Sequence, residues 1–264
     1  MTYIVAALNI TPDSFSGDGE LKNTTEKAKK LIEDGADIID IGAESTRPGA
    51  TPLSAEEEWQ RLERTLPEII NLAHKNNVKA SIDTRHHQTA SKAITMGVDF
   101  INDVEGFHSE EMINVVRQSE ASLIMMHSLT VPADRDVTIP EDKDIIPEIT
   151  KWAENTKQKL LNAGIKQERI IFDPGIGFGK TADQSWYLIK NIQQFFSLNL
   201  DILVGHSRKS FLNKITALPF AKRDIESLAI SIYCLQKGVK YIRVHDVAIH
   251  KRAFSTIGEL DVCS

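Results

Sequence analysis

Short apolar runs alternate with longer stretches of helical period along the whole chain. Eight of these runs have the length and the continuous apolar character of buried parallel strands. They are Ile4–Asn9, Ile38–Gly42, Val78–Asp83, Phe100–Asn102, Ser122–His127, Ile170–Asp173, Ile202–Gly205 and Tyr241–Val244. This alternation predicts repeated βα units and argues against an antiparallel sheet.

The stretches between these runs carry the start and stop signals of helices. Ser54 is followed three residues later by Glu57, which is the pattern of a capping box. Gly35, Gly164 and Gly238 each follow a periodic stretch and precede an apolar run by a few residues. Each glycine is therefore predicted to cap a helix in the left-handed conformation.

Eight βα units in 264 residues predict a closed (β/α)8 TIM barrel, which uses about 250 residues in typical cases. No long linker, low-complexity tract or change in composition divides the chain, so residues 1–264 are expected to form a single α/β domain. An open α/β sheet is the alternative fold. The barrel is favoured because polar residues gather at the ends of the strands.

Composition and charge limit the classes of partner. A net charge of -6 and a pI near 5.8 leave no basic stripe for nucleic acid. No run approaches the roughly 18 apolar residues that a membrane-spanning helix needs, and the apolar stretch at residues 3–8 lacks the basic flank of a signal peptide. Only Cys234 and Cys263 are present, which suits a reducing, cytoplasmic location. We therefore expect a small-molecule ligand.

Polar side chains stand at or just after the end of every predicted strand. They are Asn9, Glu44, Asp83, Asn102, Asp103, His127, Asp173, Ser207–Ser210, Arg243 and His245. In a (β/α)8 barrel the carboxyl ends of all strands meet at one mouth, where active sites lie. The sequence therefore predicts that these distant groups surround one pocket.

The side chains at these strand ends indicate two kinds of ligand group. The carboxylates of Asp83 and Asp173, with the amide of Asn102, suit a flat heterocycle that presents N–H donors along one edge, because buried carboxylates need hydrogen-bonding partners. Positive charge comes from another set: Arg208, Lys209, Arg243 and His245. These side chains suit phosphate or carboxylate groups.

The glycine-rich segment at residues 173–181 raises the possibility of a nucleotide-binding loop. The Walker pattern requires glycine where Pro174 stands, so an NTPase P-loop is disfavoured. The glycines are instead expected to allow the backbone and Phe178 to approach a ligand.

Motifs at these strand ends resemble those of the dihydropteroate synthase family, a group of folate-pathway barrel enzymes. The matching segments are Asn9-Ile-Thr-Pro-Asp-Ser-Phe-Ser16, Ile39-Asp-Ile-Gly-Ala-Glu-Ser-Thr-Arg-Pro-Gly49, Ser81-Ile-Asp-Thr84, Ile101-Asn-Asp-Val104, Met126-His127, Asp173 to Thr181, Ser207-Arg-Lys-Ser-Phe211 and Ile242-Arg-Val-His-Asp-Val247. Eight segments in the family's order, spread over the whole chain, make this resemblance specific.

The resemblance implies three groups of site residues. The pterin ring would be bound by Asp83, Asn102, Asp173 and Lys209, with Met125 and Phe178 lining that pocket. The diphosphate would be held by Asn9, Arg243 and His245, with Asn9 also a ligand of Mg²⁺. The p-aminobenzoate site would consist of Thr46, Arg47, Pro48 and Ser210. Asn9, Lys209, Arg243 and His245 would be the catalytic residues.

The resemblance also implies a reaction and an assembly. The reaction joins 6-hydroxymethyl-7,8-dihydropterin diphosphate to p-aminobenzoate, giving 7,8-dihydropteroate and diphosphate. Loops at residues 10–23 and 44–54 would fold over the pocket, and a third long loop spans residues 128–147. A homodimer is implied, with the outer helices of the C-terminal half as its surface.

Some positions depart from the family's usual pattern. They are Gly17-Asp18-Gly19, Arg85-His86, Ser185-Trp186, His206 and Glu226-Ser-Leu228. They lie outside the pterin-binding set and bear on peripheral contacts and on the level of activity.

Two other functions stay open on these residues. A pterin-binding methyltransferase domain would share the carboxylates for the heterocycle but would use methyltetrahydrofolate and a corrinoid partner. A non-catalytic pterin-binding module would bind the ring without turnover. The segments around Thr46 and Lys209 favour the synthase over the methyltransferase.

Overall fold

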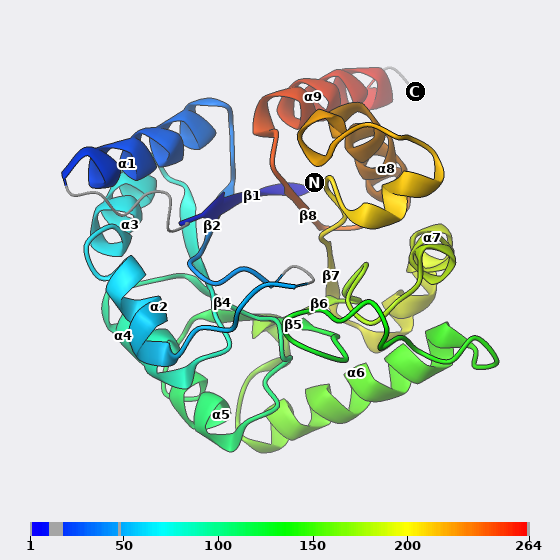
Figure 1. The fold of residues 1–264 in the computed structure, drawn as a ribbon, viewed down its shortest axis with the longest axis horizontal. Coiled ribbons are helices and arrows are strands. Elements are labelled where there is room, and N and C mark those ends of the chain that lie inside the picture. The colour runs from blue at the N-terminus through cyan, green and yellow to red at the C-terminus, as the bar shows by residue number, and fades with distance from the viewer. Residues whose placement is uncertain (1, 11–17, 47–48, 263–264) are drawn as a thin grey trace.

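The chain forms a closed barrel of eight parallel strands in the order of the sequence (Figure 1). The computed structural model describes residues 2–10, 18–46 and 49–262. The strands are β1 (Tyr3–Asn9), β2 (Ile38–Gly42), β3 (Lys79–Asp83), β4 (Phe100–Asp103), β5 (Ser122–Met126), β6 (Ile170–Asp173), β7 (Asp201–Val204) and β8 (Tyr241–Val244). β1 pairs with β8 and closes the ring, which excludes the open sheet and confirms the predicted fold.

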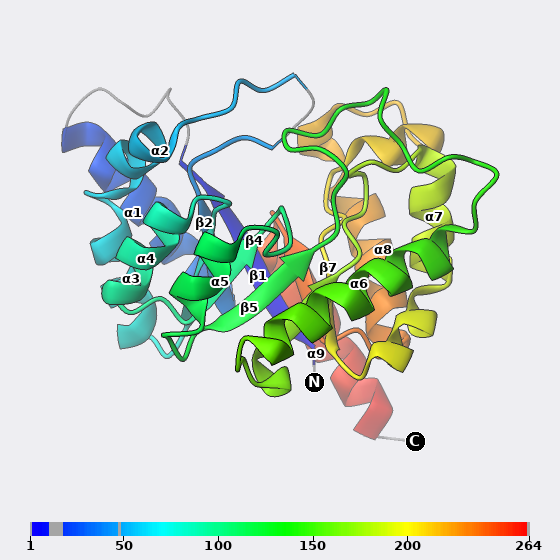
Figure 2. The same ribbon diagram turned by 90° about the horizontal axis from the view of Figure 1, so that it is seen from below.

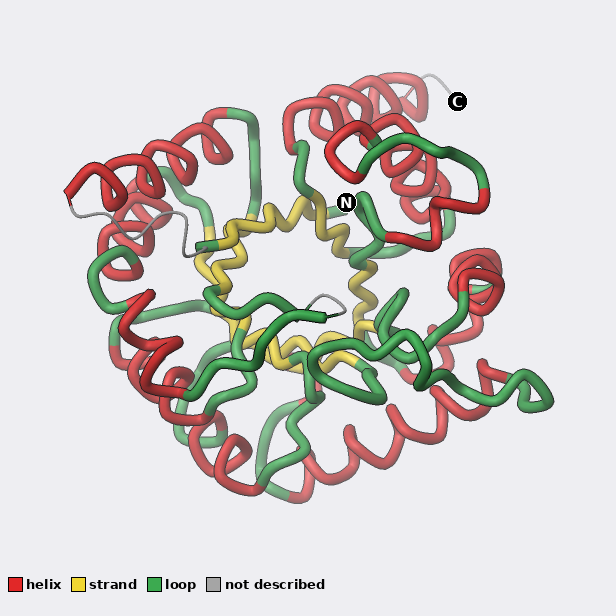
Figure 3. Tube along the Cα trace, viewed as in Figure 1, coloured by secondary structure: helices red, strands yellow, loops and turns green. Residues whose placement is uncertain are grey.

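Helices surround the ring of strands on the outside (Figure 3). The α-helices are α1 (Asp18–Glu33), α2 (Ala55–Leu62), α3 (Leu66–Lys75), α4 (His87–Thr95), α5 (Glu110–Val116), α6 (Ile145–Asn162), α7 (Ala182–Lys190), α8 (Asp224–Gln236) and α9 (Val247–Val262). Short 3₁₀ helices add η2 (Gln167–Arg169), η3 (Ile192–Leu198), η4 (Ser210–Lys214) and η5 (Phe220–Lys222). None of the helices in the described ranges is both long and apolar enough to cross a membrane.

The helix signals read from the sequence are present. Ser54 accepts a hydrogen bond from the Glu57 amide, and the Glu57 side chain in turn accepts from the Ser54 amide, so the capping box starts α2. Gly35, Gly164 and Gly238 have φ values of 96°, 86° and 88°, the left-handed conformation predicted for them.

Two separate apolar cores result from the alternation of side chains along the strands. The barrel interior holds a layer drawn from strands alone: Val5, Ile38, Phe100, Ile124, Ile171, Leu203 and, partly buried, Tyr241. The neighbouring strand residues point outward and pack with the helices in a larger cluster. The position of a residue within a strand therefore decides whether it faces the interior or the helices.

The carboxyl ends of the strands and the long loops lie at one end of the barrel. Figure 2 shows the loop before α2 and the loop before α6 at this end, while α9 finishes at the opposite end. The interior apolar layer lies below the polar side chains, since Ile38, Phe100 and Ile171 each precede by two residues a polar residue of the same strand. The upper part is left for polar chemistry.

Truncation of the interior layer should reduce stability strongly. Ile124 is 1% exposed in that layer, so Ile124→Ala should lower the free energy of unfolding by about 2 to 5 kcal/mol. Leu260→Ala, at a residue 68% exposed, should change it by about 0.5 kcal/mol or less. Urea denaturation followed by circular dichroism measures both. Equal losses would contradict the assignment of Ile124 to the barrel core.

Candidate active site

A polar layer lies directly above the apolar layer inside the barrel. Asp40, in the middle of β2, is fully buried and accepts hydrogen bonds from three strands. Ser81 Oγ donates at 2.6 Å, Asn102 Nδ2 at 3.0 Å and Arg243 Nε at 2.6 Å. A buried carboxylate is stable only with such compensation, and here β3, β4 and β8 supply it.

Arg243 joins this layer to the mouth of the barrel. Its Nη2 donates to Asp83 Oδ2 at 2.9 Å, so the guanidinium bridges the carboxylates of Asp40 and Asp83. Burial lowers the pKa of Arg243, but these carboxylates raise it by more, and the net shift is upward. The guanidinium therefore stays charged inside the barrel.

Asp173 and Lys209 form the second half of the mouth. Asp173 is 4% exposed and accepts a hydrogen bond from the Gly175 amide at 2.7 Å. Burial raises the pKa of Asp173, while Lys209 acts in the opposite direction. Lys209 donates to the Ile176 carbonyl at 2.7 Å and lies 4.6 Å above the Phe178 ring. The glycine-rich loop thus holds the lysine beside the carboxylate.

Glycines leave room for these two carboxylates. Gly42 on β2 lies beside Asp83, where an added Cβ would meet the Asp83 Cβ at 3.4 Å. Gly205 follows β7, where an added Cβ would lie 3.5 Å from Asp173 Oδ2. Because these two glycines have no side chain, they leave the mouth wider at the ends of β2 and β7.

Lys180 and His127 hold the glycine-rich loop in place through direct contacts. Lys180 Nζ contacts His127 Nδ1 at 2.7 Å and donates to the His127 carbonyl at 2.9 Å. Burial and the neighbouring Lys180 lower the pKa of His127 to about 2, so the imidazole is neutral. The Gly175 position allows this approach, because a Cβ there would lie 1.9 Å from the same carbonyl oxygen.

Three other predicted residues, His245, Asn9 and Ser210, follow or end strands at the rim of the mouth. His245 Nδ1 is 3.0 Å from Ser207 Oγ, and its ring stacks edge-on against Phe220 at 5.4 Å. Asn9 ends β1 with an exposed side chain, and Ser210 begins η4, also exposed. Rim positions such as these are open to a ligand in solution.

The loop after β2 is described only in part. Thr46 lies in it, and its carbonyl accepts a hydrogen bond from the Ala133 amide at 3.1 Å. Arg47 and Pro48, predicted for the p-aminobenzoate site, lie outside the described residues, as does Gly17 in the first loop. Asp18 begins α1.

The structure corrects the prediction for Met125. Met125 is fully buried in the outer cluster between the strands and the helices, since it alternates with Ile124 of the interior layer. Its neighbour Met126, paired in register with Asp173, has the position that faces the interior. The methionine with the interior-facing position is therefore one residue later than predicted.

Two of the polar residues at strand ends also face the helices. Asp103, which pairs in register with Met125, accepts hydrogen bonds from the Glu105 and Phe107 amides and so shapes a turn. His127 stacks edge-on against Trp152 of α6 at 4.9 Å. The expectation that every polar strand end faces the pocket is wrong for these two.

Asp40 and Lys180 were missed as functional candidates. A charged residue flanked by Ile39 and Ile41 inside a strand was the signal for Asp40. Lys180 gave no comparable signal, because its partner His127 is 53 residues away in the sequence.

One group of potential metal ligands occurs in the described part of the chain. Atoms of Glu44, Glu58 and His86 lie within 4.8 Å of one another. Arg85 donates to both Glu44 oxygens at 2.8 and 3.0 Å, and His86 Nε2 is 3.0 Å from the Leu53 carbonyl. The Arg85 guanidinium already offsets the negative charge of Glu44, so the group does not favour a bound cation.

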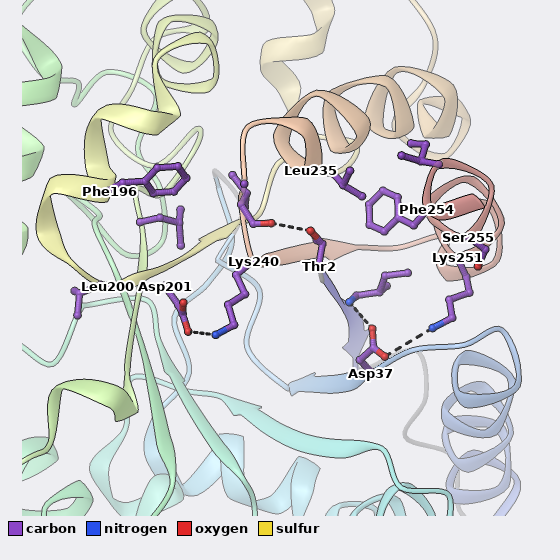
Figure 4. Close-up of a pocket in the computed structure, with 16 residues that line it drawn as sticks. Thr2, Asp37, Phe196, Leu200, Asp201, Leu235, Lys240, Lys251, Phe254 and Ser255 are labelled. Carbon is purple, nitrogen blue, oxygen red and sulfur yellow. Dashed lines mark hydrogen bonds and ion pairs between the residues drawn. The ribbon is translucent and has the colours of Figure 1, made fainter. Parts of the chain in front are cut away.

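A pocket of about 750 Å³ opens at the opposite end of the barrel (Figure 4). Its charged side chains are paired with one another, Lys240 with Asp201 at 2.7 Å and Lys251 with Asp37 at 3.8 Å. It lies beside the beginnings of β1 and β7, away from the polar layer. The candidate active site is therefore the mouth and not this pocket.

Comparison with known proteins agrees with this geometry. Residues 5–245 match the family model described as pterin binding enzyme. A dihydropteroate synthase from Synechocystis is 38% identical over 93% of this chain and 86% of its own length. The chain belongs to the dihydropteroate synthase family.

Solved dihydropteroate synthase structures share the fold closely. The enzyme from Anaplasma phagocytophilum, with bound 6-hydroxymethylpterin monophosphate, is 39% identical with a TM-score of 0.91, covering 98% of this chain and 99% of that one. The enzyme from Burkholderia cenocepacia, complexed with 7,8-dihydropteroate, is 32% identical with a TM-score of 0.88, covering 100% and 92%. A bifunctional relative from Halobacterium salinarum is longer, and this chain spans 30% of it.

Three residues that depart from the dihydropteroate synthase pattern, His206, Arg85 and His86, have hydrogen-bond partners in this chain. His206 is fully buried, with Nε2 2.9 Å from the Ser227 carbonyl and 3.0 Å from Ser231 Oγ. Arg85 and His86 bond to the loop after β2. These residues support the walls of the mouth from outside the polar layer.

Removal of the Asp40 charge should destabilise the protein. Asp40→Asn leaves the buried Arg243 with one carboxylate fewer, so the free energy of unfolding should fall by about 3 kcal/mol. Asp201→Asn breaks the ion pair with Lys240, in which the lysine is 43% and the aspartate 39% exposed. This change should lower the free energy of unfolding by about 1 kcal/mol or less. Equal losses in urea denaturation would show that Asp40 is not a buried counter-ion.

Proposed function

We propose that this chain is a dihydropteroate synthase, which condenses 6-hydroxymethyl-7,8-dihydropterin diphosphate with p-aminobenzoate to give 7,8-dihydropteroate and diphosphate. The observation that carries this proposal is the pairing, at one barrel mouth, of buried carboxylates with cationic side chains. The carboxylates of Asp83 and Asp173 lie beside Arg243 and Lys209. Family membership supports the same reaction.

The carboxylate side of the mouth suits the pterin. The ring presents N–H donors along one edge, and Asp83, Asp173 and Asn102 offer oxygen acceptors from three strands. Charge-assisted hydrogen bonds of this kind are strong where water is excluded. Phe178 and Met126 supply apolar surface beside them, and Lys209 completes the set.

The cationic side suits the diphosphate. Within the described residues, Arg243 Nη1 donates no hydrogen bond, so it is available to an anion. His245 and the exposed Asn9 extend the same rim. The amide oxygen of Asn9 is a hard ligand of the type that Mg²⁺ prefers, and bound Mg²⁺ would neutralise charge on the diphosphate.

The reaction requires departure of the diphosphate and attack by an amine. The C–O bond breaks with its electrons passing to the diphosphate, which the cations of the rim stabilise. The cationic methylene that remains is conjugated with the pterin ring, and the amine nitrogen forms the new C–N bond and then loses a proton. Thr46, Arg47, Pro48 and Ser210 would bind the amine substrate. No covalent enzyme intermediate is needed.

The test is an assay of the purified protein with the pterin diphosphate and Mg²⁺, with and without p-aminobenzoate. Diphosphate release that depends on both substrates, with dihydropteroate detected by mass, is the expected result. Pterin binding without product would overturn the proposal and favour a non-catalytic module. Methyl transfer with a corrinoid partner would favour the methyltransferase reading.

Pterin diphosphate binding should weaken at alkaline pH. Burial lowers the pKa of Lys209 to about 8, so the positive charge is lost as the pH rises through that value. Lys209→Arg keeps its charge, so the alkaline loss of affinity should move up by about one pH unit or more. Calorimetric measurement of the binding affinity from pH 6 to 10 detects this shift. Ionisation of the ligand itself affects both proteins equally, so it cancels in the comparison. An alkaline limb that stays in place would exclude Lys209 as its source.

We propose also that the protein is a cytoplasmic homodimer. Ile215, Leu218 and Ile225 near the start of α8 are 58%, 44% and 81% exposed, which is apolar surface that a second copy would cover. The buried free thiol of Cys234 suits a reducing compartment. Sedimentation velocity should give a dimer for the wild type and a monomer for Ile225→Glu. A wild-type monomer at micromolar concentration would contradict the assembly.

A further inference from the structure

The loop that leaves β2 returns to its own starting point. Glu44 follows the strand, and its Oε1 accepts a hydrogen bond from the Leu53 amide at 2.8 Å. Leu53 immediately precedes Ser54, the N-cap of α2. Residues 44–53 therefore form a loop with a closed neck, and the described residues inside it include Thr46.

Arg85, just after β3, donates hydrogen bonds to residues on both sides of that neck. Its Nε and Nη2 donate to the two oxygens of Glu44 at 2.8 and 3.0 Å, and Nη2 also lies 3.4 Å from the Leu53 carbonyl. His86 Nε2 approaches the same carbonyl at 3.0 Å. The neck is thus fixed to the end of a barrel strand by side chains, and the described residues of the loop, 44–46 and 49–53, form no helix or strand.

The contact is shielded from water. The Glu44 side chain is 4% exposed and that of Arg85 is 18% exposed. Burial raises the pKa of Glu44, but the hydrogen bonds from Arg85 and from the Leu53 amide outweigh burial and lower it overall. A bidentate pair of this kind is geometrically specific, and loss of the arginine would leave an uncompensated buried carboxylate.

We propose that Arg85 is a positioning residue for the amine substrate: it closes the neck between Glu44 and Leu53 and thereby fixes the backbone that leads into Thr46 of the proposed p-aminobenzoate site. This inference rests on the proposed function. Arg85 itself does not touch the reacting atoms. The pterin carboxylates Asp83 and Asp173 belong to the strands and have other partners, so they should be affected little.

Steady-state kinetics separates the two substrates. Arg85→Met should raise the KM for p-aminobenzoate by about tenfold, while the KM for the pterin diphosphate changes by about twofold or less. Arg85→Lys keeps one charge–carboxylate contact and should recover part of the loss. Lys240→Met, which breaks an exposed ion pair at the far end of the barrel, is the control and should leave both KM values unchanged.

A second variant tests whether Glu44 is the partner. In Arg85→Met the buried Glu44 carboxylate loses its guanidinium partner and keeps the hydrogen bond from the Leu53 amide, and Glu44→Gln removes the unpaired charge. The Glu44→Gln/Arg85→Met double variant should therefore have a p-aminobenzoate KM no higher than Arg85→Met alone. An additive rise in KM would show that the two residues act independently and would overturn the proposal.

Hydrogen exchange tests the neck without relying on catalysis. The amide of Leu53 should exchange about tenfold faster in Arg85→Met than in the wild type, with amides of β3 unchanged. Unchanged exchange at Leu53, an unchanged p-aminobenzoate KM, or an equal rise for both substrates would each overturn the role of Arg85. If the wild type makes no dihydropteroate, the proposed function fails, and the proposed role in amine binding fails with it. The exchange result then decides only whether Arg85 closes the neck.

Discussion

The Arg243 guanidinium lies inside the barrel with the carboxylates of Asp40 and Asp83 against it, and the arrangement of the mouth depends on this contact. Carboxylates that would bind a heterocycle must be kept out of water, and without a cation their burial would be prohibitively costly. Arg243 satisfies that requirement from β8, at 2.6 Å from Asp40 and 2.9 Å from Asp83. A single charged side chain therefore links the stability of the barrel to the acceptor groups at its mouth.

Strands and loops contribute different chemical groups to the mouth. Strand residues supply the acceptors for a ring, and their positions follow from the register of the barrel. The loops supply Lys209 and the segment proposed to bind the amine, and side-chain contacts hold the described parts of these loops where backbone pairing ends. Lys180 with His127 serves the glycine-rich loop, and Arg85 with Glu44 serves the loop after β2.

The order and ends of the strands could be predicted from the sequence because apolar runs and turn glycines are local signals. The positions of Asp83, Asn102 and Asp173 at or next to the ends of strands could be predicted for the same reason, since each ends an apolar run. Met125 was misplaced because alternation decides which side a residue faces, and an error of one residue at a strand end reverses it. The neck contact of Arg85 could not be predicted, because it joins residues 41 positions apart through side chains alone.

The hydrogen bond between the Ala133 amide and the Thr46 carbonyl joins two loops that come from different strands. Residues 127–144, between β5 and α6, therefore share a backbone contact with the loop after β2, where we propose that the amine binds. Insertion or deletion in the longer loop would shift its neighbour without altering a residue of the pocket. When loops are grafted between related barrels, these two loops should therefore be transferred together. Transfer of one loop alone would break the backbone hydrogen bond between Ala133 and Thr46.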